Sequence, residues 1–182
     1  MDLTSQKKTL LFVSSLFLIS SAIIAIWSYA CPCERTPGFL LMGEAQSGKI
    51  EDWGFANSIP LCQIQVLAGF RPHSINLNCM STPEGELFLS CSECDGKYWS
   101  KHVGDSERSK LRLEGKVYSV LIKREVDSVR LDAAWLARLN KLNIQRGLFS
   151  QSNPAEGNPR PLDWWSFHVA VSYTHLTLPT TD

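Results

Sequence analysis

Apolar residues form one continuous run near the N-terminus and then recur at alternate positions over much of the chain. From Thr9 to Ala30 there is no charged residue, and Leu, Ile, Phe and Val are abundant. The run matches the ~20 residues that a helix needs to cross a bilayer, whereas the apolar part of a cleaved signal peptide usually has only ~7–15. The pattern therefore predicts a membrane-anchoring helix within residues 1–30.

Charges around this run predict its orientation. Lys7 and Lys8 precede it, and only Arg35 follows closely. Because cytoplasmic flanks carry the excess of Lys and Arg, we expect a single-pass protein of the inner (plasma) membrane whose remaining chain faces the periplasm or the exterior. Two alternatives stay open. The run can be a cleaved signal, or the chain can be lipidated at Cys31, although Ser28 stands where a lipoprotein site usually has Leu.

Strand-like alternation begins at Leu61. Apolar residues occupy every second position on both sides of residues 69–72, which predicts a hairpin of two half-buried strands with a four-residue loop. A one-residue slip would bury Asn76 and Asn78, so the apolar faces select the register. The predicted pairs are Val66 with Ile75, Ile64 with Leu77, and Cys62 with Cys79.

Further periodic segments complete an α+β domain. Glu86–Ser90 predicts a third strand, residues 110–114 and 116–123 a hairpin around Gly115, and residues 162–169 a last strand. Asp127 or Ser128 can cap a helix that runs to about Asn143. One face of that helix carries Leu131, Trp135, Leu139 and Leu142. We expect a small antiparallel barrel with one or two packed helices over residues 53–170, and a linker and lead-in over residues 31–52.

Composition and motifs narrow the possible functions. The 18 Lys and Arg residues balance 18 Asp and Glu residues, which argues against a nucleic-acid partner because phosphate binding needs a basic surface. The sequence has no Ser-His-Asp spacing, no His-x-x-x-His pair and no Walker loop. Hydrolase and nucleotidase functions therefore have no support from motifs.

The last twelve residues have a separate explanation. Val171–Thr180 reads, without a gap, as the translation of a transposase-type sequencing adapter. We therefore expect the natural protein sequence to be interrupted near Ala170 and assign no role to residues 171–182. An ordinary polar tail is the alternative.

All six cysteines follow the apolar run. An even number in an oxidising compartment predicts disulfides, and the expected register favours Cys62–Cys79. Cys91 and Cys94 can pair with each other, or one of them with Cys31 or Cys33. Two alternatives stay open: a tetrahedral zinc site of Cys31, Cys33, Cys91 and Cys94, and a redox-active dithiol at Cys91 and Cys94.

A possible anion site follows the third strand. After Cys91-Ser92-Glu93-Cys94, the chain reads Asp95-Gly96-Lys97-Tyr98-Trp99. Free backbone N–H groups at a Gly-Lys turn, together with the lysine, can hold an anion. Tyr98 or Trp99 can stack on the ring of a ligand.

An ordered series of short motifs resembles a known family. The motifs are Pro72–Leu77, Gly85–Leu89, Gly96–Trp99, Lys110–Tyr118 and Trp164–Val169. Their order is similar to that in the flavin-binding split-barrel superfamily, which includes pyridoxamine-phosphate-oxidase-like proteins and deazaflavin-dependent nitroreductases. The resemblance covers roughly residues 53–169.

The resemblance implies a binding site and a function. It places the phosphate of FMN or of a deazaflavin near Gly96 and Lys97, with Ser90, Ser74 and Trp99 close by, and it implies a homodimer and oxidoreduction. Gln63 or Gln65 stands where the family usually has a basic residue, and the Cys91/Cys94 pair is not part of the family pattern. A cofactor-free, disulfide-stapled interaction protein of the cell envelope and a thiol redox protein remain the alternative functions. The sequence names no catalytic residue.

Overall fold

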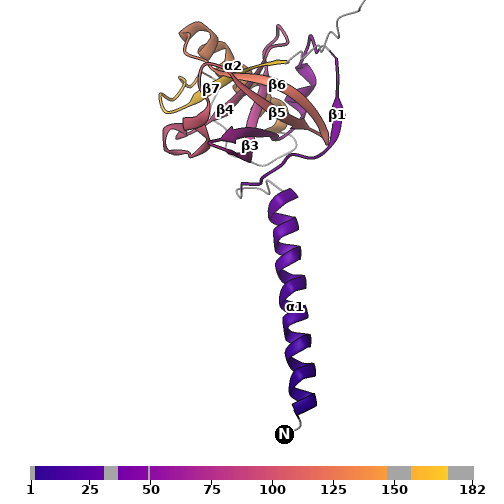
Figure 1. Cartoon of the computed structure of the whole chain (residues 1–182). Helices are drawn as coiled ribbons and strands as arrows, with labels where there is room; N and C mark the ends of the chain where they lie inside the picture. The colour runs from indigo at the N-terminus through magenta and orange to yellow at the C-terminus, as the bar shows by residue number, and fades with distance from the viewer. Residues whose placement is uncertain (1–2, 31–36, 49, 147–156, 172–182) are drawn as a thin grey trace, which may run out of the picture.

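The computed structural model describes residues 3–30, 37–48, 50–146 and 157–171. It shows a long N-terminal helix and a mixed helix-and-sheet domain (Figure 1). The elements, in chain order, are α1 (Leu3–Ala30), β1 (Glu44–Gln46), η1 (Gly54–Ser58), β2 (Cys62–Ala68), β3 (Arg71–Ser81), β4 (Leu87–Cys91), η2 (Cys94–Gly96), η3 (Trp99–His102), β5 (Glu107–Leu113), β6 (Lys116–Arg124), α2 (Ser128–Arg146) and β7 (Trp165–Val171).

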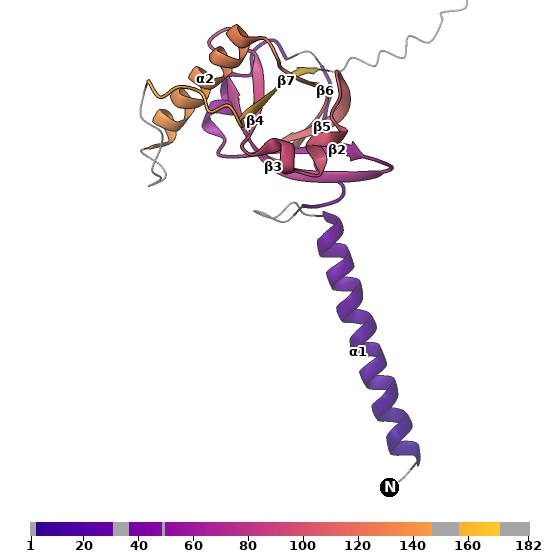
Figure 2. The same cartoon turned by 90° about the vertical axis from the view of Figure 1, so that its left-hand side faces the viewer.

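Six antiparallel strands close into a barrel. Their order is β6-β5-β2-β3-β4-β7, and β7 pairs back onto β6, so that the strands form a ring (Figure 2). Closure removes the exposed edges that an open sheet would present to other chains. The interior contains the apolar residues of the alternating pattern, among them Ile64, Leu89, Leu111 and Phe167. The predicted fold class is therefore confirmed.

The edge of β6 is shared by two strands. Lys116–Tyr118 pairs in parallel with β1, whereas Val120–Arg124 pairs with β7. The sequence pattern predicted only a linker and lead-in for the region of β1, because three residues give too little alternation to recognise. β7 ends at Val171, one residue beyond the expected junction with the adapter-like tail. Residues 172–182 lie outside the described residues.

The predicted register of the first hairpin is wrong by two residues. Cys62 lies opposite Leu77, Ile64 opposite Ile75, and Val66 opposite His73. The shift keeps every inward residue on the same face of the sheet, so the alternation could not detect it. The turn is instead the tight pair Gly69-Phe70, in which Gly69 has a φ of 68°. This value suits a glycine at the first position of a tight hairpin turn.

Helix α2 packs on the outer surface of the barrel. Asp127 precedes it and accepts a 3.0 Å hydrogen bond from the backbone N–H of Arg130, as expected of a cap. Two small residues of the helix, Ala134 and Ala137, pack against outward-facing residues of β3 and β4. In the predicted apolar face, Trp135 and Leu139 are buried, whereas Leu131 and Leu142 are only half-buried. Trp135 packs against Trp164, with ring centroids 5.4 Å apart.

Two long polar side chains attach the C-terminal half of α2 to η1. The amine of Lys141, which is 2 % exposed, donates to the carbonyl oxygens of Cys79 at 2.5 Å and Ala56 at 3.2 Å. Gln145 donates to the carbonyl oxygens of Asn57 and Ile59. Burial, together with the nearby Arg138, lowers the pKa of Lys141 from 10.5 to about 7. A helix position that reads as solvent-exposed in the sequence is therefore part of the core.

Candidate functional site

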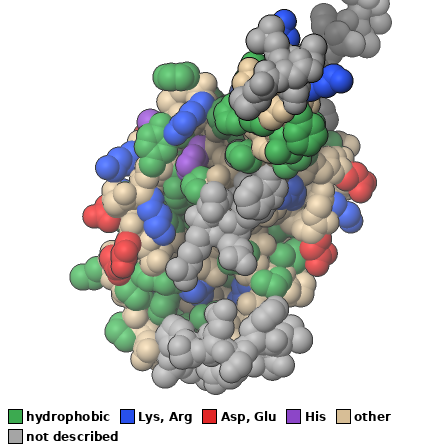
Figure 3. Space-filling model, turned by 90° about the horizontal axis from the view of Figure 1, so that it is seen from below, with side chains coloured by type: hydrophobic (Ala, Val, Ile, Leu, Met, Phe, Trp, Pro, Cys, Tyr) green, Lys and Arg blue, Asp and Glu red, His purple; other side chains and the backbone are tan. Residues whose placement is uncertain are grey.

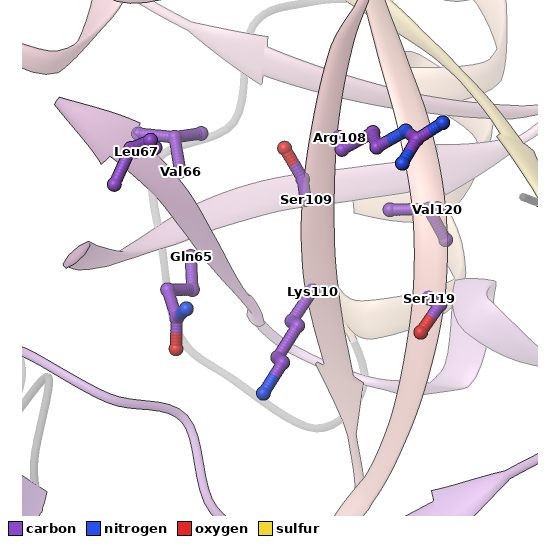
Figure 4. A pocket seen from close by; sticks show the side chains of 8 residues that line it. All are labelled: Gln65, Val66, Leu67, Arg108, Ser109, Lys110, Ser119 and Val120. Carbon is purple, nitrogen blue, oxygen red and sulfur yellow. The ribbon is translucent and has the colours of Figure 1, made fainter. Parts of the chain in front are cut away.

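A cleft opens where β2 and β5 separate. These strands pair only over Gln63–Gln65 and Lys110–Arg112. Beyond that point β2 continues along β3 and β5 continues along β6, so the two diverge. The space between them is a cleft of about 260 Å³ (Figure 4).

The cleft has an apolar floor and a basic rim. Val66, Ser109 and Val120 are buried and face inward, whereas Arg108 and Lys110 are exposed at its edge. Figure 4 shows Gln65 across from Lys110, whereas the side chain of Arg108 extends from β5 over β6. The remaining residues that line the cleft are Leu67 and Ser119. Because two cations lie beside apolar surface, the cleft suits a ligand that carries an anionic group and an apolar portion.

Gln63 and Gln65 both have a structural role. The side-chain oxygen of Gln65 accepts a 2.7 Å hydrogen bond from the backbone N–H of Leu41. The side-chain oxygen of Gln63 accepts one from Arg112, which also donates to the carbonyl oxygen of Met42 at 2.7 Å. Residues 41–42 are thereby fixed beside the cleft. No sequence signal showed this link, because the partners are about twenty to seventy residues apart.

The five residues of the predicted anion site occupy different environments. Ser74 and Ser90 are buried, and their hydroxyl groups have no hydrogen-bond partner among the described residues. Trp99 is 3 % exposed and packs on Phe167 in the core. Gly96 and Lys97 are exposed at a turn. None of the five lines the β2–β5 cleft.

The backbone of the Gly-Lys turn is already hydrogen-bonded. The N–H of Lys97 donates to the carbonyl oxygen of Cys94 at 3.1 Å, and the N–H of Gly96 donates to a carboxylate oxygen of Asp95 at 2.9 Å. An anion there would compete with a carboxylate for one of these groups. Two backbone donors of the predicted anion site therefore already have acceptors within the turn.

Tyr98 lies at the centre of a cationic and aromatic cluster. Its ring contacts those of His73 and His102, at centroid distances of 5.6 Å and 4.9 Å, and the guanidinium of Arg71 lies 5.6 Å from its centroid. Burial lowers the pKa of His73, and the positive charges of Arg71 and His102 lower it further. Of the two aromatic residues proposed for ring stacking, Tyr98 is the accessible one, with 49 % exposure.

Both described pairs of cysteines lie at disulfide distance. Cys62 pairs with Cys79, with Cα atoms 5.8 Å apart, and Cys91 pairs with Cys94, with Cα atoms 5.5 Å apart. The first pair matches the prediction, although the residues are diagonal rather than directly opposed. Cys31 and Cys33 lie outside the described residues, and no group of three or more metal-ligand side chains occurs within the described ranges.

A second cavity has the opposite charge. It has a volume of about 280 Å³ and lies between the segment before η1, the β3–β4 turn and β7. Three glutamates, Glu51, Glu84 and Glu86, line it, and Nε2 of His168 lies 3.6 Å from a carboxylate oxygen of Glu86. This acidic lining makes it unsuitable for a phosphate-bearing ligand.

The closed antiparallel barrel with one packed helix defines the class of protein, a small β-barrel domain that follows an apolar helix. Two solved structures are similar to it. A pyridoxamine 5′-phosphate oxidase-like protein from Listeria innocua shares 11 % identity, with a TM-score of 0.42, over 65 % of this chain and 88 % of its own. The FAD and heme binding protein from Mycobacterium smegmatis shares 14 % identity, with a TM-score of 0.40, over 65 % and 64 % of the two chains.

No family model and no curated protein sequence matches the chain. The assignment of the fold rests on the strand order and register described above.

Proposed function

We propose that this chain is a membrane-anchored ligand-binding barrel, and that the β2–β5 cleft takes a small molecule with an anionic group and an apolar portion. The observation that carries the proposal is the juxtaposition of Arg108 and Lys110 with the apolar floor of Val66 and Val120. A flavin-type cofactor, FMN or a deazaflavin, is the first candidate ligand because of the motif resemblance.

The cleft fits one part of such a cofactor better than the whole. Its two basic residues suit a phosphate. Its volume of about 260 Å³ lies below the roughly 300–1,000 Å³ of typical ligand pockets. The lining residues include no aromatic side chain that could stack on a flavin ring. A second copy of the chain could cover the remainder of the ligand, which agrees with the homodimer implied by the resemblance.

Two features support the anchor and the compartment. The candidate membrane span, Gln6–Ile26, has a mean hydropathy of 2.4, and none of it is buried against the protein. A helix that is apolar all round needs an apolar environment, and a bilayer provides one. The two cysteine pairs agree with an oxidising compartment, the periplasm or the cell exterior. Thiol labelling of intact cells, with and without reductant, tests the side of the membrane.

A flavin titration tests the ligand proposal. The full chain is purified in detergent, its absorption spectrum is recorded, and FMN is titrated by fluorescence quenching. A lost charge-assisted contact costs roughly 1.5–3 kcal/mol. Arg108→Gln and Lys110→Gln should therefore each weaken binding by roughly 10- to 100-fold.

The exposed Lys116, which lies outside the cleft, supplies the control Lys116→Gln. Lys97→Ala tests the anion site predicted from the sequence. If Lys97→Ala abolishes binding and the cleft variants do not, the ligand site is the Gly-Lys turn. If the chain binds no FMN and carries no small molecule by mass spectrometry, the flavin candidate fails and the interaction scaffold becomes the better explanation.

The thiol redox alternative is less favoured. Cys91 and Cys94 are 3 % and 0 % exposed, and thiol–disulfide exchange requires access to a sulfur. Reductase activity that needs no cofactor and disappears in Cys94→Ser would reinstate this alternative.

A further inference from the structure

The chain between α1 and the barrel is short and is fixed to β3. Gly38 and Ser74 exchange two backbone hydrogen bonds of 2.8 Å and 3.0 Å. Ala30, the last residue of α1, precedes Gly38 by eight residues, which span at most about 29 Å when fully extended. In both views β3 is the barrel strand next to the C-terminal end of α1 (Figure 1, Figure 2). If α1 spans a membrane, the β2–β3 hairpin lies within reach of the lipid surface.

The turn of this hairpin presents an unusually exposed aromatic residue. Phe70 is 98 % exposed, and Leu67, on the same hairpin, is 50 % exposed. Single exposed apolar residues are common, but this turn is braced from η3. The backbone N–H of Gly69 donates to Nδ1 of His102 at 3.2 Å, and the hydroxyl of Tyr98 lies 3.5 Å from the carbonyl oxygen of Ala68. The structure thus holds Phe70 in solvent on a supported turn.

The surroundings of Phe70 are basic and aromatic. Arg71 follows it directly and contacts the ring of Tyr98, and Lys97 and Lys101 are exposed on the neighbouring η2–η3 segment. The exposed acidic residues of that segment are Glu93 and Asp95. The face of the molecule seen from the side of α1 has hydrophobic and basic side chains exposed next to each other (Figure 3). Aromatic residues and cations together favour the interface of an anionic bilayer.

We propose that the β2–β3 turn is a second membrane contact, in which Phe70 enters the lipid interface and Arg71 and Lys101 contact anionic lipid headgroups. This inference rests on the proposed membrane anchor. Once α1 is inserted, the turn is tethered close to the same bilayer, which raises the effective concentration of lipid around it. One aromatic residue and two cations are therefore enough to hold the turn at the lipid surface. The contact would also limit the tilt of the barrel and thereby orient the β2–β5 cleft relative to the membrane.

Site-specific nitroxide labels on the full chain in nanodiscs test this inference. p-Acetylphenylalanine, introduced singly at three positions, carries the label without using the cysteines. Phe70 reports the turn. Leu162, which is 93 % exposed and lies just before β7, is the matched control. Phe17 lies within the candidate span and reports the anchor. Relative accessibility to lipid-soluble oxygen and to a water-soluble nickel complex gives the position of each label.

We expect the label at position 70 to be more accessible to oxygen than to nickel, and the label at position 162 to show the reverse. Omitting phosphatidylglycerol from a phosphatidylcholine nanodisc, or introducing Arg71→Gln, should shift position 70 toward nickel accessibility. A water-exposed position 70 with a lipid-exposed position 17 overturns the inference and leaves the anchor intact. A water-exposed position 17 overturns the anchor itself. Dipolar broadening between labels at position 70 of two copies would instead identify a dimer contact and would also overturn the lipid proposal.

Discussion

The buried amine of Lys141 makes the stability of the domain depend on pH. In the folded protein its pKa is lowered from 10.5 to about 7, first by burial and then by Arg138. Between these two values the unfolded chain holds a proton at Lys141 that the folded protein does not hold. The free energy of unfolding therefore rises with pH in this window and falls as the pH is lowered toward 7.

The size of the effect follows from the two pKa values. Each pH unit inside the window changes the free energy of unfolding by about 1.4 kcal/mol. From pH 7 to pH 9 the contribution of Lys141 should therefore increase by about 2–3 kcal/mol. Lys141→Met removes the titration and leaves the carbonyl oxygens of Ala56 and Cys79 without this donor, at a cost of about 1–3 kcal/mol for each.

Chemical denaturation in detergent, followed by tryptophan fluorescence at several pH values, measures this contribution. The difference in unfolding free energy between the natural chain and Lys141→Met should be larger at pH 9 than at pH 7 by about 2–3 kcal/mol. Lys116→Met, at an exposed position, should show no such growth. Parallel pH dependences for the natural chain and Lys141→Met would refute the assignment of a lowered pKa to Lys141.

Three further comparisons test the fold. Replacing both Cys62 and Cys79 by Ala opens a link with a sequence separation of 17 and should lower the free energy of unfolding by about 3 kcal/mol. Replacing both Cys91 and Cys94, with a separation of 3, should lower it by about 1.5 kcal/mol. Denaturant midpoints measure both losses, and a larger loss at the second pair would contradict this order. Gly85→Ala should lower the free energy of unfolding by about 1–3 kcal/mol, because its φ is +83° and a Cβ would lie 3.0 Å from the Cα of Asp52. Gly115→Ala, with φ +81° and open space around the Cβ, should lower it less. Equal losses would show that the close approach to Asp52 is unimportant. Glu114→Asn should stabilise by about 0.5–1 kcal/mol in thermal melts, because Glu114 has a φ of 48° in the β5–β6 turn; an unchanged midpoint would argue against strain there.

Local patterns in the sequence determined most of the fold. Alternation of apolar residues located β2–β6, Gly115 marked the β5–β6 turn, and Asp127 marked the start of α2. These features depend on nearest neighbours along the chain, because side chains of a strand alternate between its faces and a helix start requires a local acceptor. The apolar helix α1 was recognisable for a similar reason. The Cys62–Cys79 pairing was predicted from a register that is wrong by two residues, and it is found because the two cysteines remain diagonal neighbours on the same face.

Only the tertiary structure decided which residues meet across the barrel. The hairpin register shifted by two residues, a change that leaves the apolar alternation intact. The divergence of β2 and β5 beyond their short pairing opened a cleft that no local pattern predicted. Long-range contacts also assigned Gln63 and Gln65 to residues 41–42 and brought Lys141 into the core. The sequence thus determined the elements, the anchor-like helix and a disulfide, whereas the position of the candidate site depended on where the barrel strands diverge, which no local pattern encodes.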